Sequence, residues 1–135
     1  MAMELTLIQE VEVMYIIPTI RRYLAIYLKE LGKPQKAIAK LLSSRESTVS
    51  QYINEKRGCK IKFREETTDA IKKAVKRILN KYDTIREIQI LLRNIRNSDE
   101  ICVIHKQVAN MPDNCDPIDL GCNHTKSKEE LYGIK

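Results

Sequence analysis

The chain has 135 residues, with 24 lysine and arginine side chains against 18 aspartate and glutamate side chains, and a formal net charge of +6. This length suits one compact domain and is too short for a barrel or a doubly wound enzyme of roughly 200 residues or more. Hydrophobic residues make up 43% and charged residues 31%, which is typical of a globular rather than a disordered chain. The longest uncharged apolar stretch, residues 13–20, is shorter than the roughly 20 residues that a membrane span needs.

Four glycines, four prolines and 5% aromatic residues favour helices over a β-sandwich, which needs turn residues at short intervals. The N-terminus shows no basic segment followed by an apolar run, so we expect no secretory signal and a cytoplasmic location. In a reducing cytosol the four cysteines are expected to be thiols or metal ligands rather than disulfides.

Apolar spacing predicts an all-α fold. In chain order, helices are expected over residues 4–16, 18–31, 35–42, 45–54, 67–81, 84–97 and 98–110, with a short extended arm over 59–64. Pro18 is favoured in a first helical turn and so predicts a new helix, whereas Gly32 predicts a helix end. Residues 112–135 are expected to be irregular.

Residues 65–111 are expected to form a helical extension. Thr67 or Thr68 is the predicted N-cap of an amphipathic helix, and Thr84–Glu87 fits a capping box for the next one. The apolar face of the first of these helices consists of Ile71, Ala74, Val75, Ile78 and Leu79. The second carries an apolar stripe that either faces a partner or closes the domain's own core, formed by Ile85, Ile88, Leu92 and Ile95.

The positive charge is concentrated in one part of the chain. Residues 18–64, here called the basic segment, hold 12 basic and 3 acidic residues, a net of +9. Residues 1–17 carry a net of −3, and residues 65–135 carry 12 charges of each sign. A concentrated positive region indicates a nucleic-acid binder, although a solvated lysine-rich surface would look the same by charge alone.

The strongest motif lies inside the basic segment. Two short helices joined by a turn of a few residues have the geometry of a helix-turn-helix. Ala39 is small, as the crossing of the two helices requires, and Ser43 stands in the turn where glycine is commonest. Val49 then serves as the β-branched plug between the helices. A generic helical hairpin with the same periodicity is the alternative.

In such a motif the second helix, here 46–54, enters the major groove of DNA and reads base edges. The residues expected to face the bases are Arg45, Glu46, Ser47, Ser50, Gln51 and Asn54, and Thr48 is expected to contact either a thymine methyl group or a phosphate. The residues expected to hold phosphates, and so to fix register without reading sequence, are Lys33, Gln35, Lys36, Lys56 and Arg57, together with the other basic residues from Lys33 to Arg64.

Four stretches carry a resemblance to a known group: IPTIRRYLA (17–25), GKPQKAIA (32–39), STVSQYI (47–53) and KRG (56–58). Over roughly residues 4–58 the chain resembles the small archaeal transcriptional regulators that have a Cro/C1 repressor-like (XRE-like) helix-turn-helix. The resemblance implies a DNA-binding regulator, dimeric, whose recognition helix is 46–54.

A second constellation lies near the C-terminus, where Cys102, His105, Cys115 and Cys122 follow a C-x2-H-x9-C-x6-C spacing. Thiolates and imidazole suit zinc, iron or an iron–sulfur cluster, but the spacing is not a standard zinc pattern. Members of the resembled group often carry a further C-x2-C pair upstream, where this chain has Gln89 and Leu92. Reduced thiols without a metal are the alternative, and the predicted function requires no cofactor.

No sequence feature favours an enzyme, since the four glycines are isolated and form no phosphate loop. We therefore expect a DNA-binding domain over 1–64, a helical extension for dimerisation over 65–111 and a cysteine-containing tail over 112–135. The predicted function is a sequence-specific regulator that binds double-stranded DNA as a homodimer, with no small-molecule substrate and no membrane partner. The alternatives are a metal- or redox-responsive regulator and a helical protein-interaction module of an antitoxin-like or adaptor type.

Overall fold

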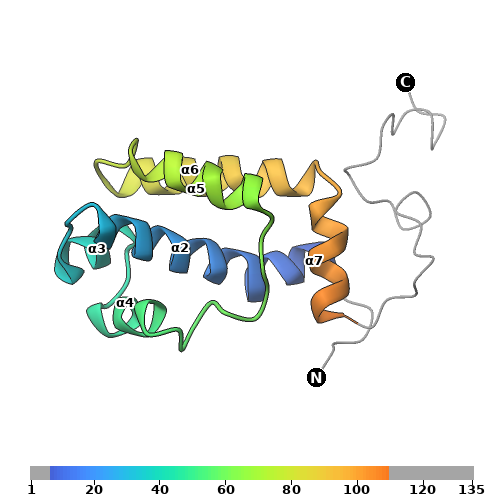
Figure 1. The fold of residues 1–135 in the computed structure, drawn as a ribbon, viewed down its shortest axis with the longest axis horizontal. Helices are drawn as coiled ribbons and strands as arrows, with labels where there is room; N and C mark the ends of the chain where they lie inside the picture. Colours follow the sequence, from blue (N-terminus) through green and yellow to red (C-terminus); the bar gives the residue numbers. More distant parts are fainter. Residues whose placement is uncertain (1–6, 110–135) are drawn as a thin grey trace.

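A computed structural model describes residues 7–109 and shows an all-helical protein, in which no strand occurs within those residues (Figure 1). In chain order the elements are α1 (Ile8–Val11), the π-helical segment η1 (Glu12–Ile16), α2 (Ile17–Glu30), α3 (Gln35–Leu41), α4 (Glu46–Ile53), α5 (Glu65–Val75), α6 (Lys81–Arg96) and α7 (Glu100–Val108). Their buried side chains form one continuous hydrophobic core. The all-α prediction is thus confirmed for the described residues. Among these helices, none has both the length and the apolar character that crossing a membrane demands.

The first helix continues through Pro18, where the sequence predicted a break. The hydrogen-bonding pattern changes instead: η1 ends with the Ile17 N–H donating to the Glu12 carbonyl, five residues earlier. In an α-helix the proline ring would press on the carbonyl of Met14, four residues back, and the wider π turn relieves that contact. The segment also changes which side chains are buried, because Val11 and Ile16 are fully buried while Met14 is 53% exposed.

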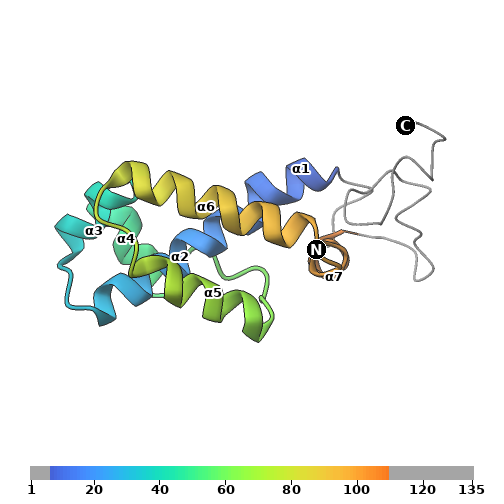
Figure 2. The same ribbon diagram turned by 90° about the horizontal axis from the view of Figure 1, so that it is seen from above.

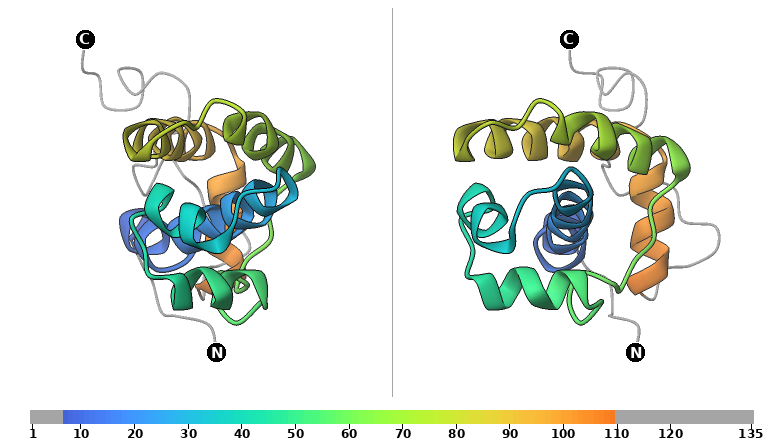
Figure 3. Two further views of the ribbon diagram at one scale, coloured as in Figure 1. Left: turned by 90° about the vertical axis from the view of Figure 1, so that its left-hand side faces the viewer. Right: turned by 60° about the vertical axis from the view of Figure 1, so that its left-hand side comes forward.

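Helix α2 lies at the centre of the molecule. The right-hand view of Figure 3 shows it nearly end-on, with α3 to its left, α4 below it, and α5 and α6 above it. Its residues Ile20, Leu24 and Leu28 are completely buried and contribute to the core at successive turns. The helix ends as predicted at Gly32, which adopts a φ of +92° and closes a turn in which the Lys33 N–H donates to the Leu28 carbonyl at 3.1 Å.

The predicted arm over residues 59–64 is an irregular connection rather than a strand. Ile61 is buried in the core, and the Lys62 backbone pairs with the Gln107 side chain through hydrogen bonds of 3.1 and 3.3 Å. The connection therefore crosses from α4 to α5 while packed against α7.

The predicted helix over residues 67–81 is shifted, since α5 begins at Glu65 and ends at Val75. Arg64 occupies the N-cap position, and the predicted cap Thr67 instead donates its hydroxyl to the buried carboxylate of Glu100. Leu79, predicted on the apolar face, is 83% exposed because the chain has left the helix before it reaches that residue.

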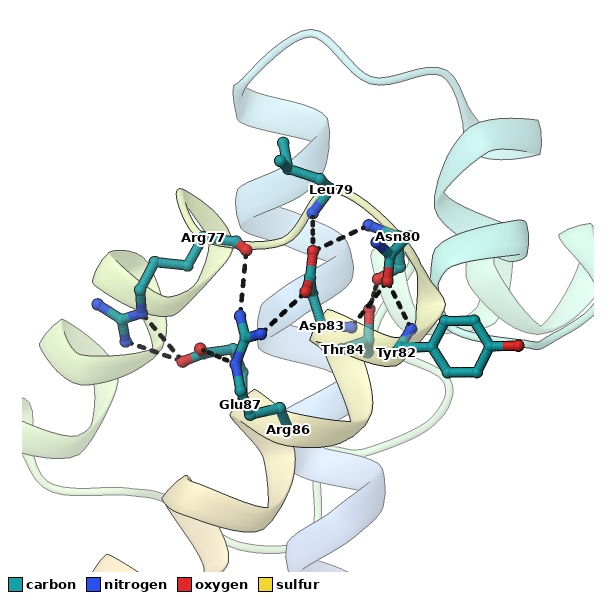
Figure 4. A network of polar contacts seen from close by, with 8 residues as sticks. All are labelled: Arg77, Leu79, Asn80, Tyr82, Asp83, Thr84, Arg86 and Glu87. Carbon is teal, nitrogen blue, oxygen red and sulfur yellow. Dashed lines mark hydrogen bonds and ion pairs between the residues drawn. The ribbon is translucent and has the colours of Figure 1, made fainter.

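The predicted capping box at Thr84–Glu87 is also wrong, because the box lies one turn earlier. The Asn80 side chain accepts from the N–H groups of Tyr82 and Asp83 at 2.9 and 3.0 Å (Figure 4). In return the Asp83 carboxylate accepts from the Asn80 N–H at 3.3 Å, and from the Leu79 N–H at 2.9 Å. Helix α6 therefore begins at Lys81, and Thr84 is buried inside it.

A carboxylate inside α6 joins this helix to the end of α5. Glu87 is 2% exposed and accepts hydrogen bonds from Arg77 at 2.8 Å and from Arg86 at 3.2 Å (Figure 4). The Arg77 hydrogen bond, with help from Arg86, lowers the pKa of Glu87 against the opposing effect of burial. The pKa of Asp83 is lowered as well, chiefly by the Leu79 N–H.

Two more buried carboxylates join elements that are distant in sequence. The carboxylate of Glu12 in η1 accepts hydrogen bonds from Nε and Nη2 of Arg96, at 3.0 and 2.9 Å, and so joins the first helix to the end of α6. Seen from above in Figure 2, α6 crosses α2 and ends beside α7. Glu100 accepts from the Arg64 N–H at 2.7 Å and ties the start of α5 to α7.

The apolar stripe predicted on the second C-terminal helix divides between core and surface. Ile95 is buried, Ile88 and Leu92 are half-buried and packed against the core, and Ile85 is 51% exposed. The most buried side of α6 is instead formed by Thr84, Glu87, Leu91 and Ile95.

Candidate nucleic-acid interface

Helices α3 and α4 pack against each other and against α2, joined by a turn over residues 42–45. Ala39 is 5% exposed and Val49 is fully buried, so the small residue and the β-branched residue lie where the sequence placed them. Ile38 and Tyr52 are buried beside them, and α4 thereby turns its other side away from the core. The predicted pair of short helices is present with its predicted inward side chains.

The turn between the two helices depends on a left-handed residue. Ser43 has a φ of +51°, and its N–H donates to the Lys40 carbonyl at 3.2 Å. The following N–H, of Ser44, donates to the Ala39 carbonyl at 2.9 Å, which completes the backbone pattern of a Schellman helix end. Glycine adopts this conformation most easily, as the sequence reading of Ser43 anticipated.

The same pattern recurs after α4. Glu55 has a φ of +60°, its N–H donates to Tyr52, and the Lys56 N–H donates to the Gln51 carbonyl at 2.8 Å. Three consecutive helices therefore end in left-handed residues, at Gly32, Ser43 and Glu55, and only the first is glycine. We call these the left-handed turns.

The residues predicted to face the bases gather on α4 and its N-terminal end. Arg45 is the N-cap residue, with an extended backbone and no side-chain cap bond. Four of the predicted base-facing residues after it are exposed: Glu46, Ser47, Gln51 and Asn54. Thr48 and Ser50 are half-buried, and the Ser50 hydroxyl accepts from the Asn54 side-chain amide at 3.3 Å.

The residues predicted to hold phosphates lie at both ends of the helix pair. Lys33 and Lys36 are exposed and Gln35 is half-buried at the start of α3, while Lys56 and Arg57 are exposed just after α4. Figure 1 shows α3 and α4 together at one end of the molecule, and the predicted contacts lie on these two helices or next to their ends.

Few of the cations in the basic segment are neutralised. Within residues 7–109, the ion pairs that involve this segment are Arg22–Glu55 at 3.1 Å and Arg64–Asp99 at 2.7 Å. Of the residues predicted to contact DNA, only Arg64 belongs to one of these pairs. The exposed positive charge of the segment is thus available to an anionic partner.

One residue that sequence reasoning missed is Lys81. It is the first residue of α6, yet it lines a shallow surface hollow of about 620 Å³ together with Lys36 and Lys40 of α3. Ser43, Ser44 and Glu46 lie at the same hollow. No sequence signal could have placed Lys81 there, because it stands 40 residues after the end of α3 and only the packing of α6 brings it near.

Two of the four predicted metal ligands lie in the described part of the chain. Cys102 is half-buried and His105 is buried, both on α7. Residues 7–109 contain no group of three or more potential ligands close enough to hold a metal. The predicted ligands Cys115 and Cys122 lie outside the described residues.

A comparison with protein-family models finds no match for this chain, and neither curated proteins nor solved structures yield a relative.

Proposed function

We propose that the protein is a sequence-specific DNA-binding regulator of transcription, in which α4 enters the major groove. The observation that carries this proposal is the placement of the α3–turn–α4 pair, with a polar outer side on α4, in the only region of strong positive charge excess. A helical hairpin that served only to close a core would have no need of unneutralised cations around it.

In this proposal the bases are read by residues on the exposed side of α4 and by its N-cap residue. Arg45 can make a bidentate contact with guanine, and Gln51 with adenine. The smaller polar residues Ser47 and Asn54 lie on the same helix and can make further contacts with base edges. Glu46 in the first turn can accept from cytosine.

The flanking cations contact phosphates and thereby fix the position of the protein along the duplex. Lys33, Lys36, Lys56 and Arg57 bracket the helix pair, and Lys81 extends this set beyond the basic segment. Each contact neutralises a phosphate and releases counterions, so affinity should fall steeply with salt.

The proposal includes a homodimer on a pseudopalindromic site, in the manner usual for this motif. An exposed apolar ridge supports it, formed where α6 begins by Leu79 (83% exposed), Tyr82 (70%) and Ile85 (51%). The capping network of Figure 4 holds the backbone of this ridge in place.

The test is selection of binding sites from a randomised duplex library, followed by a salt titration on the selected site. Gln51→Ala and Arg45→Ala should each relax base preference at a separate position, by about 1–3 kcal/mol. Lys106→Gln, on α7 at the other end of the molecule, is the matched control and should leave binding unchanged. Absence of any duplex affinity, with a co-purifying protein, would contradict the proposal and favour an interaction module.

A further inference from the structure

A second basic site lies at the C-terminal end of α4, where Tyr52 lines it, whereas Glu46 at the start of α4 lines the hollow described above. A groove of about 370 Å³ runs between the start of α2, at Pro18 and Arg21, and the chain that follows α4, at residues 56–60. It is separate from the hollow at Lys36, Lys40 and Lys81, and it shares no lining residue with it.

The charge of this groove has a single sign. Its lining includes four cations, Arg21, Lys56, Arg57 and Lys60, and no carboxylate. The nearest acid in sequence, Glu55, is paired with Arg22 at 3.1 Å. One of the four cations, Arg21, lies outside the stretch from Lys33 to Arg64 whose basic residues are expected to hold phosphates.

The groove is held in shape by backbone packing. Gly58 has a φ of +76°, and a Cβ at this position would come within 2.6 Å of the Pro18 carbonyl oxygen and 3.0 Å of the Arg22 Cβ. The loop after α4 therefore approaches α2 as closely as a glycine allows. Tyr52, which is 2% exposed, lines the inner side of the groove. The backbone that carries the cations is therefore packed against the core.

We infer that this groove is a phosphate-binding site, and that it takes a backbone phosphodiester of the DNA on the flank of the site read by α4. The planar guanidinium groups of Arg21 and Arg57 can each donate two parallel hydrogen bonds to phosphate oxygens, and the two lysines add point charges. The inference that the phosphate belongs to DNA rests on the proposed function, whereas the inference that the groove binds phosphate rests on its lining residues alone.

The experiment compares the full chain with Arg21→Gln, Lys60→Gln and the double variant, with Lys106→Gln as control. On duplex DNA the double variant should lower the slope of log affinity against log salt by about 2, because two phosphate contacts are lost. Affinity should fall at least about tenfold while base preference stays unchanged. Lys60 is exposed, so Lys60→Gln keeps the test valid if the Arg21 variant folds poorly.

A second arm uses inorganic phosphate and pyrophosphate and follows the amide NMR signals of Gly58 and Cys59. These signals should shift in the full chain and not in the double variant. If α4 variants change DNA binding but the groove variants change neither slope nor affinity, the inference is overturned and the proposed function stands. If the chain binds no duplex but pyrophosphate still shifts the groove signals, the groove is a site for free phosphate compounds and the DNA source is overturned. If neither ligand binds, both are overturned.

Discussion

Within residues 7–109, most cations of the basic segment lie on the surface without an acidic partner, whereas three carboxylates that meet the C-terminal helices are buried and paired with arginines or backbone N–H groups. Glu87, Glu100 and Glu12 each join two elements that way. The basic segment is held together by other means: an apolar core around α2, left-handed turns, and the close approach of Gly58 to Pro18. Charge therefore joins elements mainly in the C-terminal region, whereas inside the basic segment the Arg22–Glu55 pair does so and most of the other described cations stay exposed.

The largest expected effect follows from the backbone contact in the basic segment. Gly58→Ala should lower the free energy of unfolding by about 3 kcal/mol, since it combines a left-handed backbone with a contact of 2.6 Å to a carbonyl oxygen. Gly32→Ala is the matched control, because Gly32 also has a positive φ but meets nothing within 4 Å; it should cost about 1 kcal/mol. Urea denaturation measures both, and equal losses would remove the role assigned to the Pro18 contact.

The next effect tests the buried carboxylates. Glu87→Gln should cost about 2 kcal/mol, because it weakens charged hydrogen bonds from Arg77 and Arg86. Both arginines stay more than half exposed, so their charges remain hydrated and the loss stays moderate. Glu46→Gln, an exposed acid of the basic segment, should change stability by no more than about 0.5 kcal/mol. Similar losses for the two variants would erase the contrast between the regions.

The same carboxylate predicts a dependence on pH. The folded pKa of Glu87 lies below its unfolded value, so its contribution is fully present above about pH 4.3 and is lost as pH falls through the folded pKa. The stability difference between the wild type and Glu87→Gln should therefore shrink on acidification below that pH. Urea denaturation from pH 7 to pH 3 measures it, and a constant difference would contradict the lowered pKa.

A smaller gain is expected at the turn between α3 and α4. Ser43→Gly should raise the free energy of unfolding by about 0.5–1 kcal/mol, since glycine adopts the φ of +51° without a steric penalty. Ser43→Ala should leave stability nearly unchanged, because alanine keeps the Cβ that makes this backbone unfavourable. Thermal denaturation of the pair decides whether the turn is strained.

The smallest effect on stability is expected for surface cations near α3. Lys36→Gln with Lys40→Gln should change the free energy of unfolding by less than about 0.5 kcal/mol, since neither lysine belongs to an ion pair within residues 7–109. The salt dependence of DNA binding should nevertheless weaken by about 2 in slope if both contact phosphates. A marked loss of stability would show that these charges are structural after all.

Sequence reasoning succeeded where the determinants are local. The α3–turn–α4 pair follows from Ala39, Ser43 and Val49, which all lie within one short stretch and act on each other. Asn80–Asp83 and Thr84–Glu87 both fit a capping box, one turn apart, and the sequence does not decide between them. In the structure Asn80 caps the helix, while Glu87 is buried and accepts from Arg77, ten residues earlier. The groove at Gly58 likewise arises from packing between α2 and a loop nearly 40 residues later, which no spacing rule could reveal.

The π-helical segment η1 has a consequence for the length of the chain. Val11 and Ile16 are five positions apart and both fully buried, whereas an uninterrupted α-helix would place residues four apart on one side. The segment thus accommodates one residue more than the packing of its flanks requires. Deleting the residue between Val13 and Tyr15 would give the continuous helix formed by α1, η1 and α2 an α-helical spacing throughout, with Val11 still facing the core. Deleting a residue within α2 would instead rotate the buried side chains on the N-terminal side of the deletion away from their neighbours. This helix should therefore tolerate a change in length only at η1, where it is already irregular.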